Sequence, residues 1–402
     1  MSRTYDVAVV GAGPGGSATA ALLASRGYEV VLFDRAEFPR DKACAEYCSP
    51  GVEDVLRRMG AWETVAREHP RSVVGMTVWI GGRPSLPVRY GAGWRSRFAF
   101  TLPRLQLDAA LLRYARSRGV EVMEKHRCTG VRMESSGAVL EMDRLNSGAV
   151  RFRSKVLVGA DGLSSVVCRL LGIDACSRWP RRLGLIAHYD QVEGIDECGE
   201  MHVGPGTYCG LAPLPEGRVN VGLVMPLPAG GDGLRLESRF EAAIRTMPEV
   251  AAKLDRGRRI KRIRGMGPMS RRVASTAGLG YLLVGDAAGF LDPFTGEGIY
   301  RALRGAELAA ETIDHALQRI RAEAAPNLAE YARAREREFA GKERVTWLVQ
   351  AGLAFPPLLE TLCTRSRGST VVAQTVGNVL GDVGQSSTLL KPWIAARLLL
   401  PA

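Results

Sequence analysis

No stretch of the sequence approaches the run of about 18 uninterrupted apolar residues that a membrane-crossing helix needs, so no transmembrane helix is expected. Cysteine is sparse, with eight residues and no Cys-x-x-Cys pair, which argues against a disulfide framework. Cys44 and Cys48 have no histidine near them in the sequence, so no metal site is expected. The sequence does not open on a charged leader followed by an apolar segment, and we therefore expect no secretory signal and a cytoplasmic protein.

Lysine is scarce as well, because only seven of the 54 basic residues are Lys and the other 47 are Arg. Basic residues outnumber the 42 acidic ones and give a formal net charge of +12. The densest basic run, residues 256–264, has two interpretations: a solvated strand or loop face, or a patch for phosphate or a nicotinamide cofactor. No zinc-finger spacing or aromatic ribonucleoprotein motif accompanies it, so no nucleic-acid partner is expected.

The rest of the composition is that of an ordinary globular protein, with 46% hydrophobic and 24% charged residues. The 46 glycines show no period of three, which excludes a collagen-like chain. A length of 402 residues is enough for two packed domains.

The first 35 residues predict a strand, a glycine-rich turn, a helix and a second strand. Residues 5–10 form a β-branched run, residues 17–26 a helix of small side chains, and residues 30–33 the next strand. The turn between the first two elements contains Gly11-x-Gly13-x-x-Gly16. This context, and not the glycine spacing alone, predicts a dinucleotide-binding motif.

Each residue of the motif has a physical task. Gly11 allows the tight turn, Gly13 lets the backbone approach a pyrophosphate, and Gly16 lets the helix pack closely on the strand. The helix N-terminus offers free N–H groups and a partial positive charge to the phosphates. An acid that closes the second strand can accept hydrogen bonds from a ribose. The residues that we assign to the dinucleotide here are Gly11, Gly13, Pro14, Gly15, Gly16, Asp34 and Arg35.

Later segments alternate between helical and strand patterns. A helix is predicted at 105–118 and a strand at 120–123, while residues 183–225 become short β runs broken by Pro and Gly. The segment 213–218 reads as a hairpin turn between strands at 208–212 and 219–225. A buried strand at 279–284 precedes an amphipathic helix at 298–319, and the tail beyond residue 327 is mostly helical. This order predicts an α/β fold with a Rossmann-like domain, an inserted antiparallel β-sheet domain and a helical C-terminal tail.

Two further motifs identify the dinucleotide. One is Gly159-Ala160-Asp161-Gly162, and the other runs from Gly285-Asp286 through Pro293 to Gly296-Glu297-Gly298. With the first glycine motif they resemble, in order and spacing, the para-hydroxybenzoate hydroxylase superfamily of FAD enzymes, and most closely its geranylgeranyl-reductase-like branch. The resemblance runs from residue 5 to about residue 317.

The resemblance implies FAD as cofactor and a role for specific residues. Asp286, after Gly285, would bind the ribityl chain, and Asp161 belongs to a second cofactor-binding motif. Pro293 and the Gly296-Glu297-Gly298 turn would place backbone N–H groups beside the flavin N1–C2=O edge, where reduced flavin carries negative charge. On this basis we expect the following division of the chain: FAD-binding domain, 1–70, 95–175 and 275–340; substrate-binding sheet domain, 71–94 and 176–274; helical C-terminal region, 341–402.

Arg104 and Cys44 also match the branch. Arg104 corresponds to an Arg before a helix that lies near the cofactor, although a surface Arg at a helix N-terminus is the plain alternative. Cys44 lies in a segment like Lys-x-Cys-Gly-Glu, with Ala45 in place of the Gly, and the branch places this Cys near the isoalloxazine ring. A buried, inert thiol is the alternative for Cys44. The sequence departs from the superfamily at Cys168, where an Arg is usual.

Three reactions occur in this superfamily: hydroxylation through a flavin hydroperoxide, halogenation, and saturation of isoprenoid double bonds. Halogenases carry a Lys after the first helices and a Trp-x-Trp-x-Ile-Pro stretch. Here no Lys occurs between Lys42 and Lys125 and the Trp motif is absent, so halogenation is not expected.

The isoprenoid reductases have a Tyr-x-Trp-x-Phe-Pro run, whereas this chain has Tyr208-Cys209-Gly210-Leu211-Ala212-Pro213. Gly210 and Ala212 vacate the volume of two aromatic rings, and residues two apart on a strand share a face. The main hypothesis is an NAD(P)H-dependent monooxygenase of secondary metabolism that hydroxylates a hydrophobic aromatic or polycyclic substrate. The alternatives are a reductase of C=C bonds in an isoprenoid or quinone, and a flavin-binding redox protein without turnover.

The catalytic groups and the partners are less specified. Tyr208, His188 and His202 could orient a phenol or accept its proton, although a histidine in a sheet is more often structural. NAD(P)H would bind transiently, because no second Gly-x-Gly-x-x-Gly exists. The apolar segment 389–400 is compatible with peripheral membrane contact or with docking on the FAD domain. The oligomeric state stays open.

Overall fold

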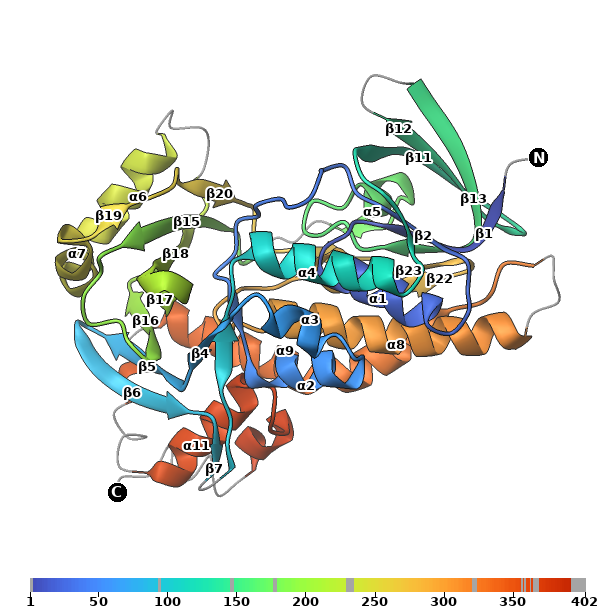
Figure 1. The fold of residues 1–402 in the computed structure, drawn as a ribbon. Helices are drawn as coiled ribbons and strands as arrows, with labels where there is room; N and C mark the ends of the chain where they lie inside the picture. The colour runs from blue at the N-terminus through green and yellow to red at the C-terminus, as the bar shows by residue number, and fades with distance from the viewer. Residues whose placement is uncertain are drawn as a thin grey trace.

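The computed structural model describes residues 3–92, 95–144, 148–175, 179–228, 235–319, 324–355 and 369–391, with 357, 359–361 and 363. Two large sheets stand side by side, with most of the helices gathered under the first (Figure 1). The N-terminus lies at the outer end of β1, away from the second sheet, and the C-terminal helices reach the second sheet (Figure 1).

The first sheet is parallel in its central part. The β-branched run of β1 is almost wholly buried and pairs in parallel with β2 on one side and β13 on the other. A hairpin of β11 and β12 extends β13 in antiparallel sense. The strands of this sheet are β10 (Glu121–Met123), β2 (Val30–Phe33), β1 (Thr4–Val10), β13 (Gly148–Gly159), β12 (Gly137–Arg144), β11 (His126–Glu134), β23 (Tyr281–Leu283) and β22 (Ala277–Gly278).

Helix α1 (Pro14–Ala24) packs between α4 (Arg104–Ser117) and α8 (Gly298–Arg319) under this sheet (Figure 1). Its small side chains are nearly all buried, which allows this close packing on both sides. The glycine turn therefore opens at the carboxyl end of β1, where ligands bind in sheets of this type. The predicted order of strand, glycine turn, helix and strand is confirmed, and α8 has the predicted bounds.

The second sheet draws on residues 75–89 and 182–266. Its strands are β19 (Arg258–Arg259), β15 (Arg182–Asp190), β18 (Val219–Pro226), β17 (Thr207–Pro213), β16 (Cys198–Gly204), β5 (Gly75–Ile80), β6 (Arg83–Arg89) and β20 (Arg264–Met266). The predicted hairpin is present, with η1 (Pro215–Gly217) between β17 and β18. The sheet is antiparallel except for β16 and β5, which come from separate segments of the chain and pair in parallel.

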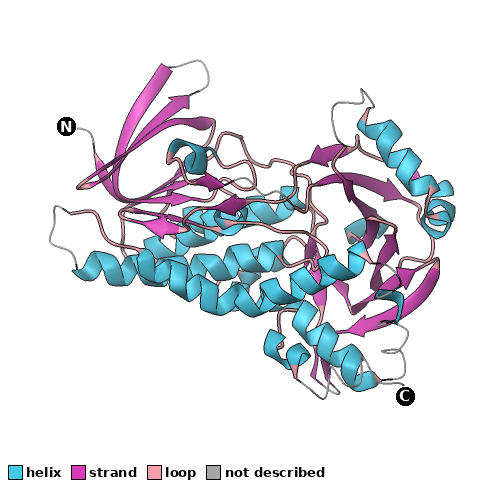
Figure 2. Cartoon of the chain, turned by 180° about the vertical axis from the view of Figure 1, so that it is seen from behind, coloured by secondary structure: helices cyan, strands magenta, loops and turns pink. Residues whose placement is uncertain are grey.

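One face of the second sheet is covered by α6 (Leu236–Arg245) and α7 (Pro248–Asp255), through a core that includes Leu223, Phe240 and Val250. Figure 2 shows these helices on the outer side of the sheet. Because side chains alternate along a strand, the residues between those core positions face the other way, toward the first sheet and its helices.

Short elements complete the fold. A small sheet joins β3 (Tyr47–Cys48), β9 (Ala99–Thr101) and β4 (Arg71–Val73), and β7 (Gly91–Ala92) pairs with β8 (Arg95–Ser96), as β14 (Asp174–Ala175) does with β21 (Arg272–Val273). The remaining helices are α2 (Pro50–Arg58), α3 (Trp62–Ala66), α5 (Val166–Leu170), η2 (Gly285–Ala288), α9 (Ala329–Ala354), α11 (Thr370–Leu380) and η3 (Ser386–Leu390). The tail is thus helical as predicted, and among the described residues no helix is both long and apolar enough to cross a membrane.

Candidate cofactor and substrate site

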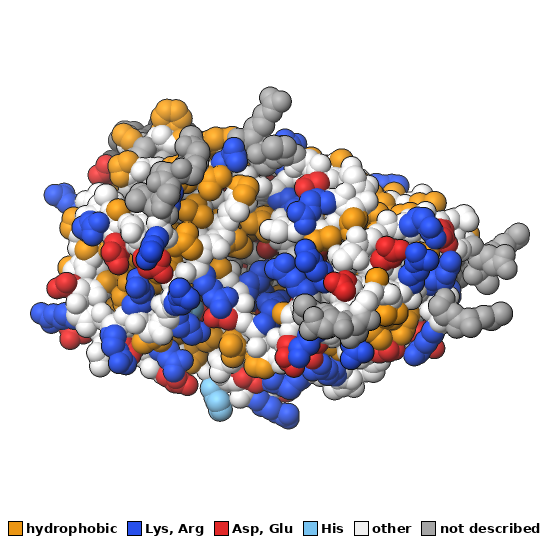
Figure 3. Space-filling view, turned by 90° about the horizontal axis from the view of Figure 1, so that it is seen from above, with side chains coloured by type: hydrophobic (Ala, Val, Ile, Leu, Met, Phe, Trp, Pro, Cys, Tyr) orange, Lys and Arg blue, Asp and Glu red, His pale blue; other side chains and the backbone are white. Residues whose placement is uncertain are grey.

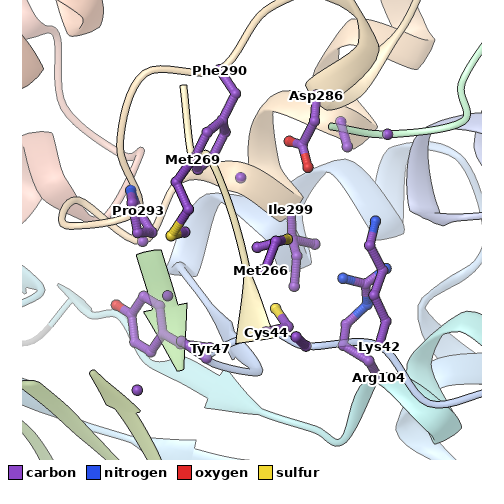
Figure 4. A pocket seen from close by; sticks show the side chains of 18 of the residues that line it. Lys42, Cys44, Tyr47, Arg104, Met266, Met269, Asp286, Phe290, Pro293 and Ile299 are labelled. Atoms are coloured by element: carbon purple, nitrogen blue, oxygen red, sulfur yellow. The ribbon is translucent and has the colours of Figure 1, made fainter. Parts of the chain in front are cut away.

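A cavity lies where the carboxyl ends of the first sheet meet the open face of the second. Figure 4 shows its two characters: Lys42, Arg104 and Asp286 gather on one side, while Met269, Pro293 and Tyr47 lie on the other. From outside, Lys and Arg side chains surround a recess in the middle of one face of the molecule (Figure 3). We call the two parts the charged end and the apolar end.

The glycines of the first turn separate into packing positions and one open position. A Cβ on Gly11, whose φ is +103°, would stand 2.5 Å from the carbonyl oxygen of Ala160. A Cβ on Gly15 would be 2.9 Å from Cγ1 of Val284, and one on Gly16 would overlap the carbonyl of Gly11. These positions therefore exclude a side chain for reasons of packing.

Gly13 is different, because a Cβ there would meet only guanidinium groups, Arg40 Nη2 at 3.8 Å and Arg104 Nη2 at 4.0 Å. The space in front of Gly13 is thus open and bordered by cations. Gly13, Pro14 and Gly15 all line the cavity, at the N-terminus of α1. This is a cradle for an anionic group such as a pyrophosphate.

The cations of the charged end are held by one buried acid. Arg104 makes two hydrogen bonds to Asp108, of 2.7 and 2.8 Å, and Arg40 Nη1 lies 2.9 Å from Asp108 Oδ2. Burial alone would lower the pKa of Arg104, but Asp108 raises it above its usual range. Burial lowers the pKa of Lys42, the third cation. A phosphate placed here would meet a preorganised positive site, which fits the diphosphate of FAD.

Asp34 and Arg35 end β2 beside this cradle. Asp34 is buried, and its Oδ2 accepts a 2.8 Å hydrogen bond from the backbone N–H of Ala12, while Oδ1 accepts one from Ala36. The acid therefore ties the glycine turn to the end of the second strand. Arg35 is exposed at the surface.

The motif around Asp286 contributes to both ends of the cavity, with Asp286 at the charged end and Pro293 at the apolar end (Figure 4). Gly285, Asp286, Pro293, Gly296 and Gly298 all line it. Gly296 has a φ of +68°, which favours glycine, and a Cβ there would stand 2.9 Å from the ring of Tyr47. The backbone conformation and the close contact therefore both require glycine at this position. Helix α8 begins at Gly298, and its first two residues line the cavity. The positive end of the helix dipole therefore lies at the cavity wall, which suits an electron-rich flavin edge.

Two residues assigned to the cofactor stand behind this lining. Glu297 lies outside the cavity wall and pairs with Arg301 at 3.2 Å and with Lys342 at 3.6 Å. Asp161 accepts hydrogen bonds from the backbone N–H groups of Val166 and Val167, at 2.6 and 3.2 Å, and so caps α5. Ala160 and Gly162, its neighbours, line the cavity in its place.

The departure at Cys168 has a structural counterpart. Cys168 is buried, and its thiol donates to the carbonyl of Ala287 at 3.4 Å. Arg271, from another segment, is also buried and donates to the carbonyl of Leu163 at 2.6 Å. A guanidinium thus reaches the turn after Asp161 even though the usual Arg is absent from the sequence.

Cys44 lines the middle of the cavity, between the charged and apolar ends (Figure 4). Its Sγ accepts a hydrogen bond from the backbone N–H of Glu46 at 3.3 Å. Cys48, in contrast, is fully buried in the core, and burial raises the pKa of its thiol well above the usual range. Of these two cysteines, Cys44 is the one that lines the cavity.

A buried polar cluster fixes the segment that carries Cys44. Glu46 Oε2 lies 2.7 Å from His188 Nε2 and accepts from Asn220 Nδ2 at 3.0 Å, while its Oε1 accepts from the backbone N–H of Arg104. Asn220 also donates to the carbonyl of Cys44 at 2.9 Å. His188 therefore lies behind the cavity wall as part of this cluster and does not line the cavity.

His202 and Tyr208 are also committed to protein partners. His202 stacks on Trp79 and lies 2.8 Å from Glu200, away from the cavity lining. Tyr208 does line the cavity, but its hydroxyl donates to Asp292 at 2.6 Å. Gly210 lines the cavity beside it, whereas Ala212, on the same face of the strand, lies beyond the lining.

Several residues of the site lie outside the motifs that predict it. Lys42 lines the cavity and Arg40 borders the open space at Gly13. Both precede Cys44 in the segment that resembles the branch, so a local signal exists. Gly222, Met266 and Met269 are far apart in the sequence, and they meet because β18 and β20 pair with β15 and the N–H of Met269 donates to the carbonyl of Arg182.

The structure bears on one of the two surface segments, the basic run at 256–264, and describes little of the other, the apolar segment at 389–400. The basic run at 256–264 is largely exposed, with Arg258 paired to Asp190 at 2.7 Å and Arg256 to Glu193 at 3.2 Å, as a solvated face would be. Arg264 and Lys261 reach Asp41, beside Lys42. Most of the apolar segment 389–400 lies outside the described residues.

Comparison with known proteins agrees with this geometry. The model of the FAD binding domain family matches residues 4–340. The chain is 32% identical over 338 residues to menaquinone reductase of Mycolicibacterium smegmatis, covering 77% of this chain and 76% of that protein. It is 31% identical over 327 residues to digeranylgeranylglycerophospholipid reductase 1 of Methanococcoides burtonii, covering 78% and 76%.

Among solved structures, a flavoprotein/dehydrogenase of Cytophaga hutchinsonii superposes with a TM-score of 0.85 at 20% identity, covering 98% of this chain and 96% of that one. At this identity the similarity concerns the fold alone. Together with the family match and the cationic cradle, these findings make FAD the cofactor. The chain belongs to the FAD binding domain family and is an FAD-dependent oxidoreductase of the geranylgeranyl-reductase-like branch.

Proposed function

We propose that this oxidoreductase reduces a carbon–carbon double bond in a lipophilic, isoprenoid-type substrate, with NAD(P)H as the source of electrons. The observation that carries the proposal is the chemistry of the apolar end. Its lining includes Ile186, Met201, Val224, Met266 and Met269. The hydroxyls of its two described tyrosines are committed to protein partners, Tyr47 to Tyr90 and Tyr208 to Asp292. Such a wall suits a hydrocarbon better than a phenol, which needs a base to ionise it.

The curated relatives support the same reaction class, because they are named menaquinone reductase and digeranylgeranylglycerophospholipid reductase. Reduced FAD supplies a hydride when bound, and the second carbon of the double bond then requires a proton. The protein must position the double bond beside the cofactor, exclude water and hold that proton.

Cys44 is the residue best placed to hold the proton. It lines the cavity between the two ends, and its Sγ accepts from the N–H of Glu46, so the thiol proton is not used in that contact. Lys42, Arg104 and Asp286 lie at the charged end (Figure 4), and the hydroxyl of Tyr47 donates to Tyr90 at 2.6 Å. A thiol that donates its proton to carbon becomes a thiolate, and the thiolate takes up a new proton from solvent between turnovers.

An anaerobic single turnover tests the proposal. The protein is reduced with NAD(P)H without oxygen and mixed with a polyprenyl substrate, and the product is analysed by mass spectrometry. A product heavier by two hydrogens supports the reductase. Cys44→Ala should slow this product by about tenfold or more while FAD stays bound, as expected for loss of a proton donor. Cys128→Ala, at a buried thiol elsewhere, is the matched control.

Hydroxylation of a flat aromatic substrate is the second candidate, and one observation favours it: Gly210 and Gly222 leave part of the apolar wall without side chains. A product heavier by one oxygen, formed only in air and labelled by ¹⁸O₂, would establish this reaction in place of the reductase. Reduction of the flavin by NAD(P)H without any product from either substrate class would instead favour a redox protein without turnover.

A further inference from the structure

A row of four residues crosses the wall of the apolar end. Ile186 on β15 is in register with Gly222 on β18, Gly222 with Gly210 on β17, and Gly210 with Met201 on β16. All four line the cavity. Two adjacent strands therefore present bare backbone at the centre of the row, with an apolar side chain at each end.

The protein itself does not require glycine at these two positions. Neither residue has a φ in the left-handed region. A Cβ on Gly222 would come no nearer than 3.4 Å to Ile186 Cδ1, and one on Gly210 no nearer than 3.5 Å to Met201 Cε, which are ordinary contacts. Glycine weakens the interior of a strand, so its presence at both positions needs an explanation. Contacts within the protein do not give one, and we therefore look for it in what the cavity binds.

Gly184 makes the contrast clear. It lies on the same face of the sheet, one row away, and also lines the cavity. A Cβ on Gly184 would stand 2.5 Å from Met269 Sδ, so packing inside the protein explains that glycine. Packing explains neither Gly210 nor Gly222.

The shape of the bare region indicates what lies on it. Neighbouring strands are about 4.8 Å apart, so Ile186 and Met201 are separated by roughly 14 Å of sheet. A hydrocarbon chain that runs along the strands covers only one of the two exposed backbones, whereas a flat ring system laid on the sheet covers them together. Met201, Met266 and Met269 border the cavity, and their flexible thioethers pack well against ring edges.

We propose that Gly210 and Gly222 form a seat for a planar ring system of the substrate, so that the substrate is a ring-bearing isoprenoid and not an open prenyl chain. This inference rests on the proposed function, because it specifies the substrate of the same cavity. The ring lies on the two strands, and its prenyl tail extends from the row.

The test compares binding of two probes with and without the ring. The probes are a naphthoquinone carrying a short prenyl tail and the corresponding open-chain prenyl alcohol, titrated into the FAD-loaded protein while the flavin absorbance is followed. In the Gly210→Ala/Gly222→Ala double variant, two methyl groups lift the ring from the sheet. We expect the Kd of the ring probe to rise at least tenfold and that of the open chain to change less than twofold.

Gly204→Ala is the matched control, because Gly204 lies on β16 outside the cavity lining and a Cβ there would have a similar nearest contact, 3.4 Å from Met247 Cε. FAD content and Tm should match the wild type in all variants. The single alanine variants replace the double variant if its Tm falls.

Three results overturn the proposal: equal weakening of both probes, no weakening of either, or failure of the ring probe to bind the wild type. Failure of the proposed function is seen separately, because binding is measured without turnover. If the ring probe binds as expected and neither probe gains two hydrogens in its prenyl chain in an anaerobic turnover, as read by mass spectrometry after the naphthoquinone ring has been reoxidised in air, the ring seat stands and the reductase proposal falls.

Discussion

Tyr208 and Asp292 share a buried 2.6 Å hydrogen bond, which commits the hydroxyl of the phenol in the apolar wall to a protein partner. Asp292 is held in turn by Arg182, whose Nε lies 3.2 Å from its other oxygen. Burial, with Asp292 nearby, raises the pKa of Tyr208 well above its usual range. Tyr208 is therefore a wall residue and a poor source of a proton.

The Tyr208→Phe variant should keep FAD and change kcat/KM by less than about threefold, because the ring surface in the cavity is retained. Its free energy of unfolding should fall by about 1–3 kcal/mol, since a buried carboxylate loses its donor. Thermal denaturation and steady-state kinetics measure the two effects. Tyr189→Phe, on the same sheet, is the control. A hundredfold loss of kcat with an altered pH profile would assign Tyr208 a chemical role instead.

FAD retention tests the charged end. Asp34 ties the glycine turn to β2, and Asp286 lines the cavity. Asp34→Ala and Asp286→Ala should each lose at least half of the bound FAD on dialysis, as read from the flavin absorbance relative to the protein absorbance. Asp6→Ala removes an acid of the same domain that instead pairs with Lys155, and it should keep its FAD. Stoichiometric FAD in both test variants would mean that neither acid holds the cofactor.

The parts that sequence predicted well are those in which a local pattern determines the structure. Gly16 needs glycine because a side chain there would overlap the carbonyl of Gly11 in the same turn, and helix α8 follows its own apolar periodicity. The cofactor and the Rossmann-like sheet follow from such signals.

The substrate wall follows from strand register, which no local pattern specifies. Gly210 was recognised, but its partner Gly222 lies on the next strand of the hairpin and becomes its neighbour only through the register. Ala212 shares the face of Gly210 yet lies beyond the cavity. Alternation along a strand predicts which side of the sheet a residue faces, but it does not predict how far along the strand the cavity extends. His188 reaches Glu46 across 142 positions of sequence, a contact that no spacing could indicate.

The Glu46 cluster should act on turnover through the position of Cys44. Glu46 is buried, and it accepts from Asn220 and from the N–H of Arg104 besides meeting His188. In Glu46→Ala these groups lose their acceptor, which should reduce the free energy of unfolding by about 1–3 kcal/mol. We expect kcat to fall about tenfold as the segment with Cys44 shifts, because small displacements at a reacting group are costly.

Glu46→Gln keeps an acceptor of the same shape and should recover most of the lost kcat. Stopped-flow reduction of the bound flavin by NAD(P)H separates this effect from a general loss of folding, since flavin reduction should be nearly unchanged in both variants. If Glu46→Ala turned over at the wild-type rate, the cluster would have a structural role only.

A buried charge network links the turn at Glu297 to the C-terminal helices. Lys342 on α9 pairs with Asp382, which follows α11, and lies 3.6 Å from Glu297. Ser49 donates to Asp382 at 2.5 Å. Burial raises the pKa of Asp382 from 3.8 to about 6, although Lys342 opposes this shift.

We expect Asp382 to make the free energy of unfolding of the protein depend on pH. Between about pH 4 and 6 the carboxyl is ionised in the unfolded chain but still protonated in the fold, so the contribution of Asp382 to stability decreases as the pH rises. A pKa raised by roughly two units corresponds to about 3 kcal/mol, complete above the folded pKa. Asp382→Asn cannot ionise, and its Tm relative to the wild type should therefore rise from pH 4 to pH 7. Differential scanning calorimetry at both pH values measures this change, and a Tm difference that stays constant across the range would show that Asp382 does not titrate there.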